Sequence, residues 1–155
     1  MTAYLLDTNI WLRSVQREAP HHPIAVEALA TLLAQGNDVF ITAQNLIEFW
    51  SVASRPIEVN GLGWPVETVR QEIDRLQAQF PLLDDTADVF THWLQLVSAY
   101  RVIGRRVHDA RLVAAMLSHG VMHLLTFNRD DFRQFTMIIV VTPMDVLASP
   151  EQSSS

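Results

Sequence analysis

Short apolar runs alternate with longer amphipathic segments along this chain, and this alternation constrains its fold more than any other feature. Four runs have the length and composition of buried strands, and a fifth, at residues 81–83, is weaker. The other four cover residues 4–6, 39–41, 123–126 and 138–141. Strands that alternate with helices predict an α/β fold with a central parallel sheet of four or five strands between layers of helices.

The segments between these runs carry apolar residues at helical spacing. One helix opens at residues 7–9, and the others span residues 22–35, 43–55, 65–80, 86–100, 109–119 and 129–135. Gly36 and Gly120 supply the stops of two of them. A turn at residues 60–63 and a basic loop at residues 101–106 lie between helices.

The length of 155 residues suits one domain, which we place at residues 1–148, followed by a disordered tail at residues 149–155. The longest apolar runs fall far short of the ~20 residues that span a bilayer, so we expect no membrane segment. The chain starts without the basic and apolar regions of a secretory signal, which makes the cytoplasm the expected location.

Composition limits the chemistry. Cysteine is absent, so any metal must be held by oxygen or imidazole, which favours hard cations. The net charge of −6 argues against a broad basic surface for nucleic acid, so any RNA contact must be local. Lysine is also absent, and all 11 cationic side chains are arginine.

Three acids stand out, and each has an ordinary structural explanation. Asp7 and Asp109 precede apolar helices, where a carboxylate stabilises the helix N-terminus. Glu48 lies inside a helix with apolar neighbours, where an unpaired carboxylate is rarely buried, although an exposed helix face would also explain it.

Four short motifs occur in order along the chain: Asp7-Thr8-Asn9 after the first strand, Gln44-Asn45-Leu46-Ile47-Glu48-Phe49, His108-Asp109-Ala110, and Thr126-Phe127-Asn128-Arg129-Asp130-Asp131-Phe132 after a later strand. Taken together, they resemble those of the PIN-domain nucleases, and within them the VapC-type toxins of bacterial toxin–antitoxin pairs. The segment from Ser54-Arg55-Pro56 to Gly63 is similar to a stretch common in those toxins. The resemblance covers residues 5–143 and implies the PIN-like three-layer α/β/α sandwich.

By position, the resemblance makes Asp7, Glu48 and Asp109 an acidic triad that binds Mg²⁺ or Mn²⁺. Its supporting residues are Thr8, Asn9, Thr126 and Asn128. Many members have a further acid two residues after the threonine, where this chain has Asn128, so either Asp131 supplies a fourth catalytic acid or there are only three. Asp130 and Asp131 are also explained as solvated charges at a helix start.

The resemblance further implies an endoribonuclease that leaves a 5′-phosphate and a 3′-hydroxyl, a cognate antitoxin and a homodimer. The chemistry of the acids agrees with this independently. Three carboxylates within ~4 Å would repel by about 4 kcal/mol per pair at an effective dielectric of ~20, so a cation must neutralise them or their pKa values must rise. Mg²⁺ or Mn²⁺ is the natural occupant of such a site.

Other sites fit the sequence less well. His119 and His123 have zinc-like spacing, but Gly120 interrupts the helix that would align them. A phosphatase with an aspartyl nucleophile needs a second Asp where Asn9 stands, a phospho-receiver needs a lysine, and no glycine-rich phosphate loop is present. Two alternatives to a toxin stay open: a catalytically silent PIN-like scaffold, and a nuclease that processes RNA or DNA outside a toxin–antitoxin pair.

Two features concern partners. Arg105, Arg106 and Arg111 flank Asp109 and either grip RNA phosphates or form a solvated basic loop. Four apolar residues near the acids could leave a groove for a helix of the antitoxin, whose basic side chain would reach the carboxylates, although core packing explains them as well. These residues are Trp11, Leu12, Phe49 and Trp50.

Overall fold

A sheet of five parallel strands in the order β3-β2-β1-β4-β5 forms the centre of the computed structural model, which describes residues 2–148. The strands are β1 (Ala3–Leu6), β2 (Asp38–Thr42), β3 (Leu82–Leu83), β4 (His123–Leu125) and β5 (Ile139–Val141). Tyr4 is in register with Val39 on one side and His123 on the other. The expected parallel sheet is confirmed, including its weakest strand.

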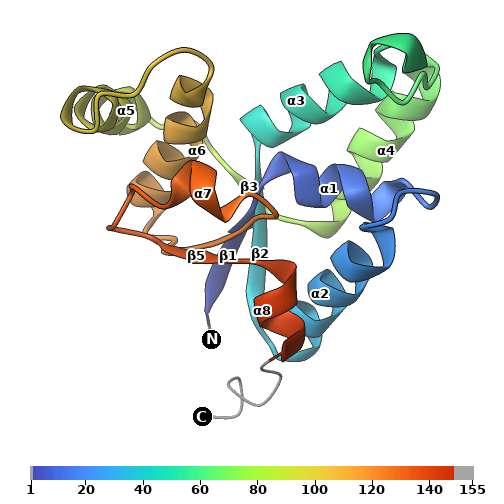
Figure 1. Cartoon of the computed structure of the whole chain (residues 1–155), viewed down its shortest axis with the longest axis horizontal. Coiled ribbons are helices and arrows are strands. Elements are labelled where there is room, and N and C mark those ends of the chain that lie inside the picture. Colours follow the sequence, from blue (N-terminus) through green and yellow to red (C-terminus); the bar gives the residue numbers. More distant parts are fainter. Residues whose placement is uncertain (1, 149–155) are drawn as a thin grey trace.

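Helices cover both faces of this sheet (Figure 1). They are α1 (Thr8–Val15), α2 (His22–Ala34), α3 (Ala43–Ser54), α4 (Val66–Gln79), α5 (Ala87–Ala99), α6 (Arg106–His119), α7 (Arg129–Phe132) and α8 (Pro143–Ala148), with a 3₁₀ turn η1 (Ile57–Val59). Successive strand residues point to opposite faces. Leu6 therefore packs with the helices α1 to α4 and α8, and Leu5 with α5 to α7, which gives the three-layer sandwich.

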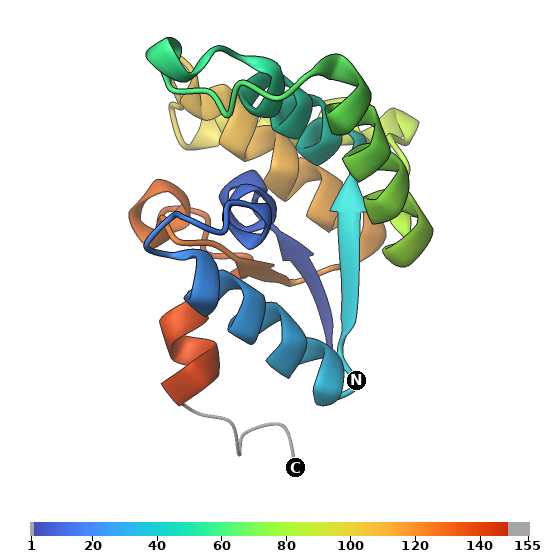
Figure 2. The same cartoon turned by 90° about the vertical axis from the view of Figure 1, so that its right-hand side faces the viewer.

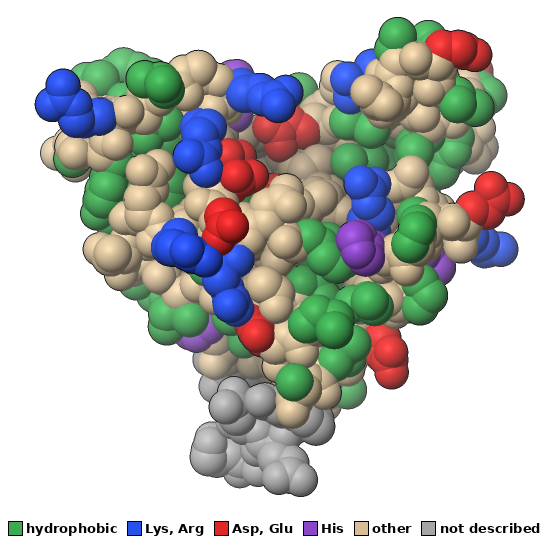
Figure 3. Space-filling view, viewed as in Figure 1, with side chains coloured by type: hydrophobic (Ala, Val, Ile, Leu, Met, Phe, Trp, Pro, Cys, Tyr) green, Lys and Arg blue, Asp and Glu red, His purple; other side chains and the backbone are tan. Residues whose placement is uncertain are grey.

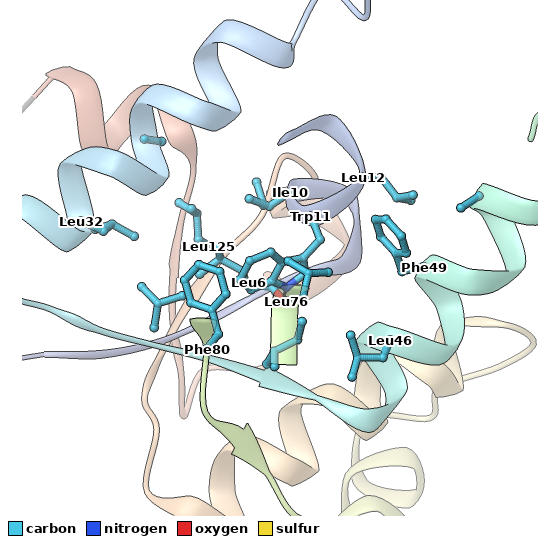
Figure 4. Close-up of a cluster of buried hydrophobic side chains, with 14 of the residues drawn as sticks. Leu6, Ile10, Trp11, Leu12, Leu32, Leu46, Phe49, Leu76, Phe80 and Leu125 are labelled. Atoms are coloured by element: carbon cyan, nitrogen blue, oxygen red, sulfur yellow. Dashed lines mark hydrogen bonds between the residues drawn. The ribbon is translucent and has the colours of Figure 1, made fainter. Parts of the chain in front are cut away.

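The core between the sheet and helices α1 to α4 and α8 contains the aromatic side chains Trp11, Phe49 and Phe80 (Figure 4). Trp11 packs edge-on against Phe80 at 4.8 Å between ring centroids, and its indole N–H donates to the Leu6 carbonyl oxygen at 3.2 Å. Trp11 and Phe49 are 1% and 0% exposed, and Leu12 is also buried. The groove suggested for these three residues is therefore wrong, because they are core; Trp50 alone of that set is half-buried.

Several boundaries differ from the expected ones. The sixth helix begins at Arg106 rather than Asp109, because Gly104 turns the chain with a φ of +61° and the next residues already follow helical geometry. Asp109 thus lies inside the first turn of α6 and does not precede it. The structure also contains η1 and α8, for which the sequence predicts no helix, and it ends α7 at Phe132 rather than at Phe135.

The turn after α3 folds back on that helix and occupies its last carbonyl groups. The amides of Leu62, Gly63 and Trp64 donate to Val52, Arg55 and Ala53 at 2.8–3.0 Å. A Cβ at Gly61 would lie 1.9 Å from the Arg55 carbonyl oxygen, so this close approach requires glycine.

All strands run in one direction, so their carboxyl ends share one edge of the sheet, as the arrowheads of β1 and β2 show in Figure 2. In open parallel sheets this edge is where ligands bind. Among residues 2–148, no helix combines the length and apolar character needed to cross a bilayer. The tail expected to be disordered, residues 149–155, lies outside the described residues.

Candidate active site

Asp7 lies at the carboxyl end of the sheet, where the chain leaves β1 and enters α1. Its amide donates to the Leu125 carbonyl oxygen of β4 at 2.9 Å, which fixes it between two neighbouring strands. Its Oδ1 accepts from the Thr8 amide at 2.8 Å, and its Oδ2 accepts from the Thr126 hydroxyl, also at 2.8 Å. Both carboxylate oxygens are therefore held in place, and Asp7 is only 9% exposed.

Glu48 reaches the same region from α3. Its Oε1 accepts a hydrogen bond from the Thr8 hydroxyl at 2.7 Å, and its Oε2 accepts from the Gln44 amide group at 3.1 Å. The Thr8 hydroxyl in turn accepts from the Asn45 side chain at 3.1 Å. Thr8 thus connects the first two acids, with its backbone on Asp7 and its side chain on Glu48.

Asn45 is itself fixed by the start of its own helix. Thr42 and Asn45 form a capping box, in which the Asn45 amide donates to the Thr42 hydroxyl and the Thr42 amide donates to the Asn45 side-chain oxygen, each at 3.0 Å. Both residues are fully buried. A structural motif that begins α3 therefore also orients Thr8 and, through it, Glu48.

Asp109 joins this region from the other side of the sheet, on α6. The Gln44 amide group donates to the His108 carbonyl oxygen at 2.7 Å, and the Arg111 guanidinium donates to the Gln44 side-chain oxygen at 2.9 Å. Gln44 consequently ties α3 to the first turn of α6. A pocket of about 500 Å³ opens there, lined by Glu48, Arg105, Arg106, His108, Asp109 and Asp131.

The pocket lies in a hollow between the α5–α6 side and the α3–α4 side of the molecule. Figure 3 shows acidic side chains in this hollow and arginines around its rim. Asp131 contributes from α7, where its carboxylate pairs with Arg106 at 3.0 Å. Asp131 is 43% exposed at its side chain, so this ion pair is largely solvated.

The acids affect each other's protonation. The pKa of Asp7 is raised from 3.8 to about 7. Burial is the largest cause, the hydrogen bonds from Thr126 and Thr8 lower the pKa, and the charges of Asp109 and Glu48 raise it. The pKa of Asp109 is raised to about 6, chiefly by burial and then by the charges of Asp131 and Glu48, while Arg106 and Arg105 lower it. These carboxylates therefore form one electrostatically coupled group.

Such a group suits a hard cation. Its donors are carboxylate oxygens, and their raised pKa values mean that negative charge is under-compensated there. Within residues 2–148, however, no three acidic or histidine side chains are close enough to ligate one ion as they stand. Asp7 is fixed on both oxygens, so a shared ion requires Glu48 or Asp109, which are only partly buried, to change rotamer.

The other candidate residues make few contacts with the acids or none. The Asn9 side-chain oxygen is buried without a hydrogen-bond partner in the described part of the chain. Asn128 is exposed, and only its backbone amide, which donates to the Thr126 hydroxyl at 3.0 Å, contacts the site. His119 approaches the Asp84 carbonyl oxygen at 2.7 Å at the end of α6, whereas His123 packs beside Tyr4 in β4.

Sequence interpretation gave no role to Gln44, Asn45 or Thr42, although the structure uses all three to orient the site. A signal for two of them was present. Gln44 and Asn45 precede Glu48 by four and three residues, the spacings that put helical side chains on one face. Polar residues that share a face with an acid in an otherwise apolar helix are candidates to hydrogen-bond it.

Comparisons with known proteins agree with this architecture. The family model described as PIN domain matches residues 4–136. Ribonuclease VapC24 of Mycobacterium tuberculosis (strain CDC 1551 / Oshkosh) is 28% identical over 145 residues, which cover 90% of this chain and 95% of that protein.

Solved structures are also similar. VapBC-1 from nontypeable Haemophilus influenzae gives a TM-score of 0.70 at 17% identity, over 92% of this chain and 99% of that chain. A toxin–antitoxin complex from Klebsiella pneumoniae gives 0.62 at 21% identity, over 90% and 97%. At these identities the likeness shows a shared fold.

Proposed function

The chain belongs to the PIN-domain family, and from this membership and its acidic site we propose that it is a metal-dependent endoribonuclease, the toxin of a toxin–antitoxin pair. The observation that carries the proposal is the connection of the acids. Asp7 and Glu48 are linked through Thr8 at the carboxyl edge of the sheet. The charge of Asp109, which lies on α6, raises the pKa of Asp7. The ribonuclease name of the relative from Mycobacterium tuberculosis supports RNA as the substrate.

We assign the roles as follows. Asp7, Glu48 and Asp109 would hold Mg²⁺ or Mn²⁺, and the ion would supply a water molecule of lowered pKa and positive charge beside the scissile phosphate. Thr126 and the Thr8 amide keep the Asp7 carboxylate in one orientation.

Gln44 and the Thr8 hydroxyl similarly restrict Glu48. Asp131, aligned by Arg106, is the proposed fourth acid. Asn9 and Asn128 are assigned supporting roles by the family resemblance.

Arginines around the pocket are the proposed contacts to RNA phosphates. Arg105 and Arg106 line the pocket itself, and Arg111 lies one helical turn beyond His108. Arg106 and Arg111 already pair with Asp131 and Asp85, each at 3.0 Å. These exposed ion pairs contribute little stability, so a phosphate can compete for the guanidinium groups at small cost.

We further propose an antitoxin partner and a homodimer. The similar toxin–antitoxin complex from Klebsiella pneumoniae supports the partner. An almost entirely apolar groove of about 450 Å³ runs beside Glu48, lined by Leu46, Ile47, Trp50, Ser51 and Ile73. Ile47 is 67% exposed there, which suits an apolar anchor of the antitoxin next to the acidic site. With RNA as its substrate, the proposed place of action is the cytoplasm.

Cleavage of RNA by the purified chain tests the proposal. We expect fragments from a single-stranded RNA in Mn²⁺ or Mg²⁺ and none in excess EDTA. Asp7→Asn and Glu48→Gln should each lower the rate by more than about a hundredfold, the order seen when one group that stabilises transition-state charge is lost. Asp38→Asn is the matched control, because Asp38 is exposed at the opposite, amino end of β2.

The alternatives give other results. A silent scaffold would cleave nothing under any of these conditions. A processing nuclease would cleave RNA or DNA but would neither arrest growth when expressed alone nor have an antitoxin gene immediately upstream. Coexpression with that upstream gene should restore growth if the chain is a toxin, and Ile47→Asp should prevent the rescue if the groove beside Glu48 receives the partner.

A further inference from the structure

A second pocket, of about 310 Å³, lies between α5 and α6 and is lined by Val89, Phe90, Trp93, Val107, His108 and Arg111. Its surface is mostly apolar, yet it is open to solvent. Phe90 is 64% exposed, and its ring stacks on that of Trp93 at 5.8 Å between centroids and 28° between planes. Phe90 and the half-buried Trp93 thus present a contiguous aromatic surface to solvent.

This base pocket, as we call it from here on, adjoins the acidic pocket. His108 lines both, and the next residue in the chain is Asp109. The Trp93 indole N–H donates to the Val107 carbonyl oxygen at 2.8 Å, while the His108 carbonyl oxygen accepts from Gln44. The wall between the pockets is therefore fixed from both sides, by α5 and by α3.

Charge favours a polyanion as the occupant. Arg111 stands at the edge of the base pocket, and Arg105 and Arg106 stand at the edge of the acidic one. A chain of phosphates that follows these arginines passes from one pocket to the next.

We propose that the base pocket receives an unpaired base of the RNA, stacked on the Phe90–Trp93 pair, while a neighbouring phosphate lies over the acidic pocket. This inference rests on the proposed ribonuclease function. Single-stranded RNA is commonly recognised by stacking of splayed bases on aromatic side chains, with cations along the backbone. Stacking on Phe90 discriminates single strands from duplexes, because the bases of a duplex are already stacked on each other.

Binding of a short single-stranded RNA and of an abasic strand of the same length, at one ionic strength and in EDTA, tests this directly. The parent should bind the RNA more tightly than the abasic strand. Phe90→Ala should weaken RNA binding by about 5- to 150-fold, the effect of losing one base–aromatic stack, and leave the abasic strand unaffected. Phe90→Trp should restore the preference.

Leu94→Ala is the matched control, since Leu94 is 48% exposed on the same helix and does not line the pocket. Equal binding of both strands by the parent, or the same loss in Leu94→Ala as in Phe90→Ala, overturns the base pocket. A parent dimer that Phe90→Ala converts to monomer at equal thermal stability also overturns it, in favour of an interface between copies.

Cleavage assays separate this inference from the function on which it rests. In a parent that cleaves RNA, Phe90→Ala should raise KM with little change in kcat, because the stack is made in both the bound and the transition state. Cleavage with an unchanged KM in Phe90→Ala leaves the nuclease standing and overturns the base pocket. A parent that binds RNA through Phe90 but never cleaves it overturns the nuclease alone.

Discussion

The buried carboxylate of Asp7 makes the metal-free protein less stable at high pH, and this effect can be measured. Its pKa is raised from 3.8 to about 7 in the folded protein. Between those values the folded protein keeps a proton that the unfolded chain has released. The contribution of Asp7 to stability is therefore fully present below pH 3.8 and is lost as the pH rises through about 7.

The difference of about three pH units corresponds to about 4 kcal/mol for the fully ionised state. Asp7 is only 9% exposed, so solvent screening reduces this little. Asp7→Asn removes the charge and keeps an oxygen that can accept from the Thr8 amide. Between pH 5 and pH 8 the parent should lose about 3 kcal/mol more than the variant, or roughly 6–12 °C in relative Tm.

Urea unfolding of both proteins in EDTA, at several pH values, gives the two stability curves. The two proteins share every other titratable group, so the difference between the curves reports Asp7 together with its electrostatic coupling to Asp109 and Glu48. Asp7→Asn should become the more stable protein at pH 8. Parallel curves across this range would show that ionisation of Asp7 costs no folding free energy. That result would refute the inference that burial disfavours the charged form of Asp7.

Three further predictions concern the same residues. Mn²⁺ should raise the Tm of the parent at pH 8, and Asp7→Asn should remove most of the increase; equal increases would exclude a shared site. Thr8→Val should slow cleavage about 10- to 100-fold and cost about 1–3 kcal/mol in unfolding free energy, because Glu48 loses a donor and Asn45 an acceptor; an unchanged rate would contradict the positioning role. Trp11→Ala should cost about 3–5 kcal/mol in urea unfolding; a smaller cost would mean that Trp11 is not part of the core.

The fold was largely predictable because the pattern of apolar residues and the topology rules agree. Short buried runs separated by helical segments allow little other than a parallel sheet, and even residues 82–83 pair with β2. The helix boundaries that were predicted wrongly, and the helix that was missed, depend on tertiary contacts. The start of α6 depends on the turn at Gly104, and α8 forms where Val146 reaches the core beside α2.

The candidate site was predictable as a set of acids but not as a network. Asp7, Glu48 and Asp109 come from three separate segments, and only the resemblance indicated that they belong together. The bridges between them depend on hydroxyl and amide groups of Thr8, Gln44 and Asn45, whose partners lie on other elements. Hydrogen bonds between residues on different elements leave no periodic pattern in the sequence. The role of a buried Gln or Asn is therefore visible only in the structure.

The aromatic residues show the same limit. Apolar residues at helical spacing indicate a buried face, but they do not show which aromatic side chain remains exposed. Trp11 and Phe49 enter the core, while Phe90 on α5 remains exposed beside the acidic pocket. The helix packing of α5 on α6 decides this difference, and it leaves the ring of Phe90 beside Trp93 at the surface.

The origin of the oxygen in the cleaved product tests the central claim most directly. RNA is cut by the parent in Mn²⁺ and heavy-oxygen water, and the fragment ends are weighed by mass spectrometry, with Asp109→Asn and Asp38→Asn alongside. If the acids promote hydrolysis, the 5′-phosphate should carry one heavy oxygen and the other fragment a 3′-hydroxyl. Asp109→Asn should give neither end, and Asp38→Asn should behave like the parent. Ends carrying a 2′,3′-cyclic phosphate without heavy oxygen, or undiminished cutting by Asp109→Asn, would contradict hydrolysis by this cluster of acids.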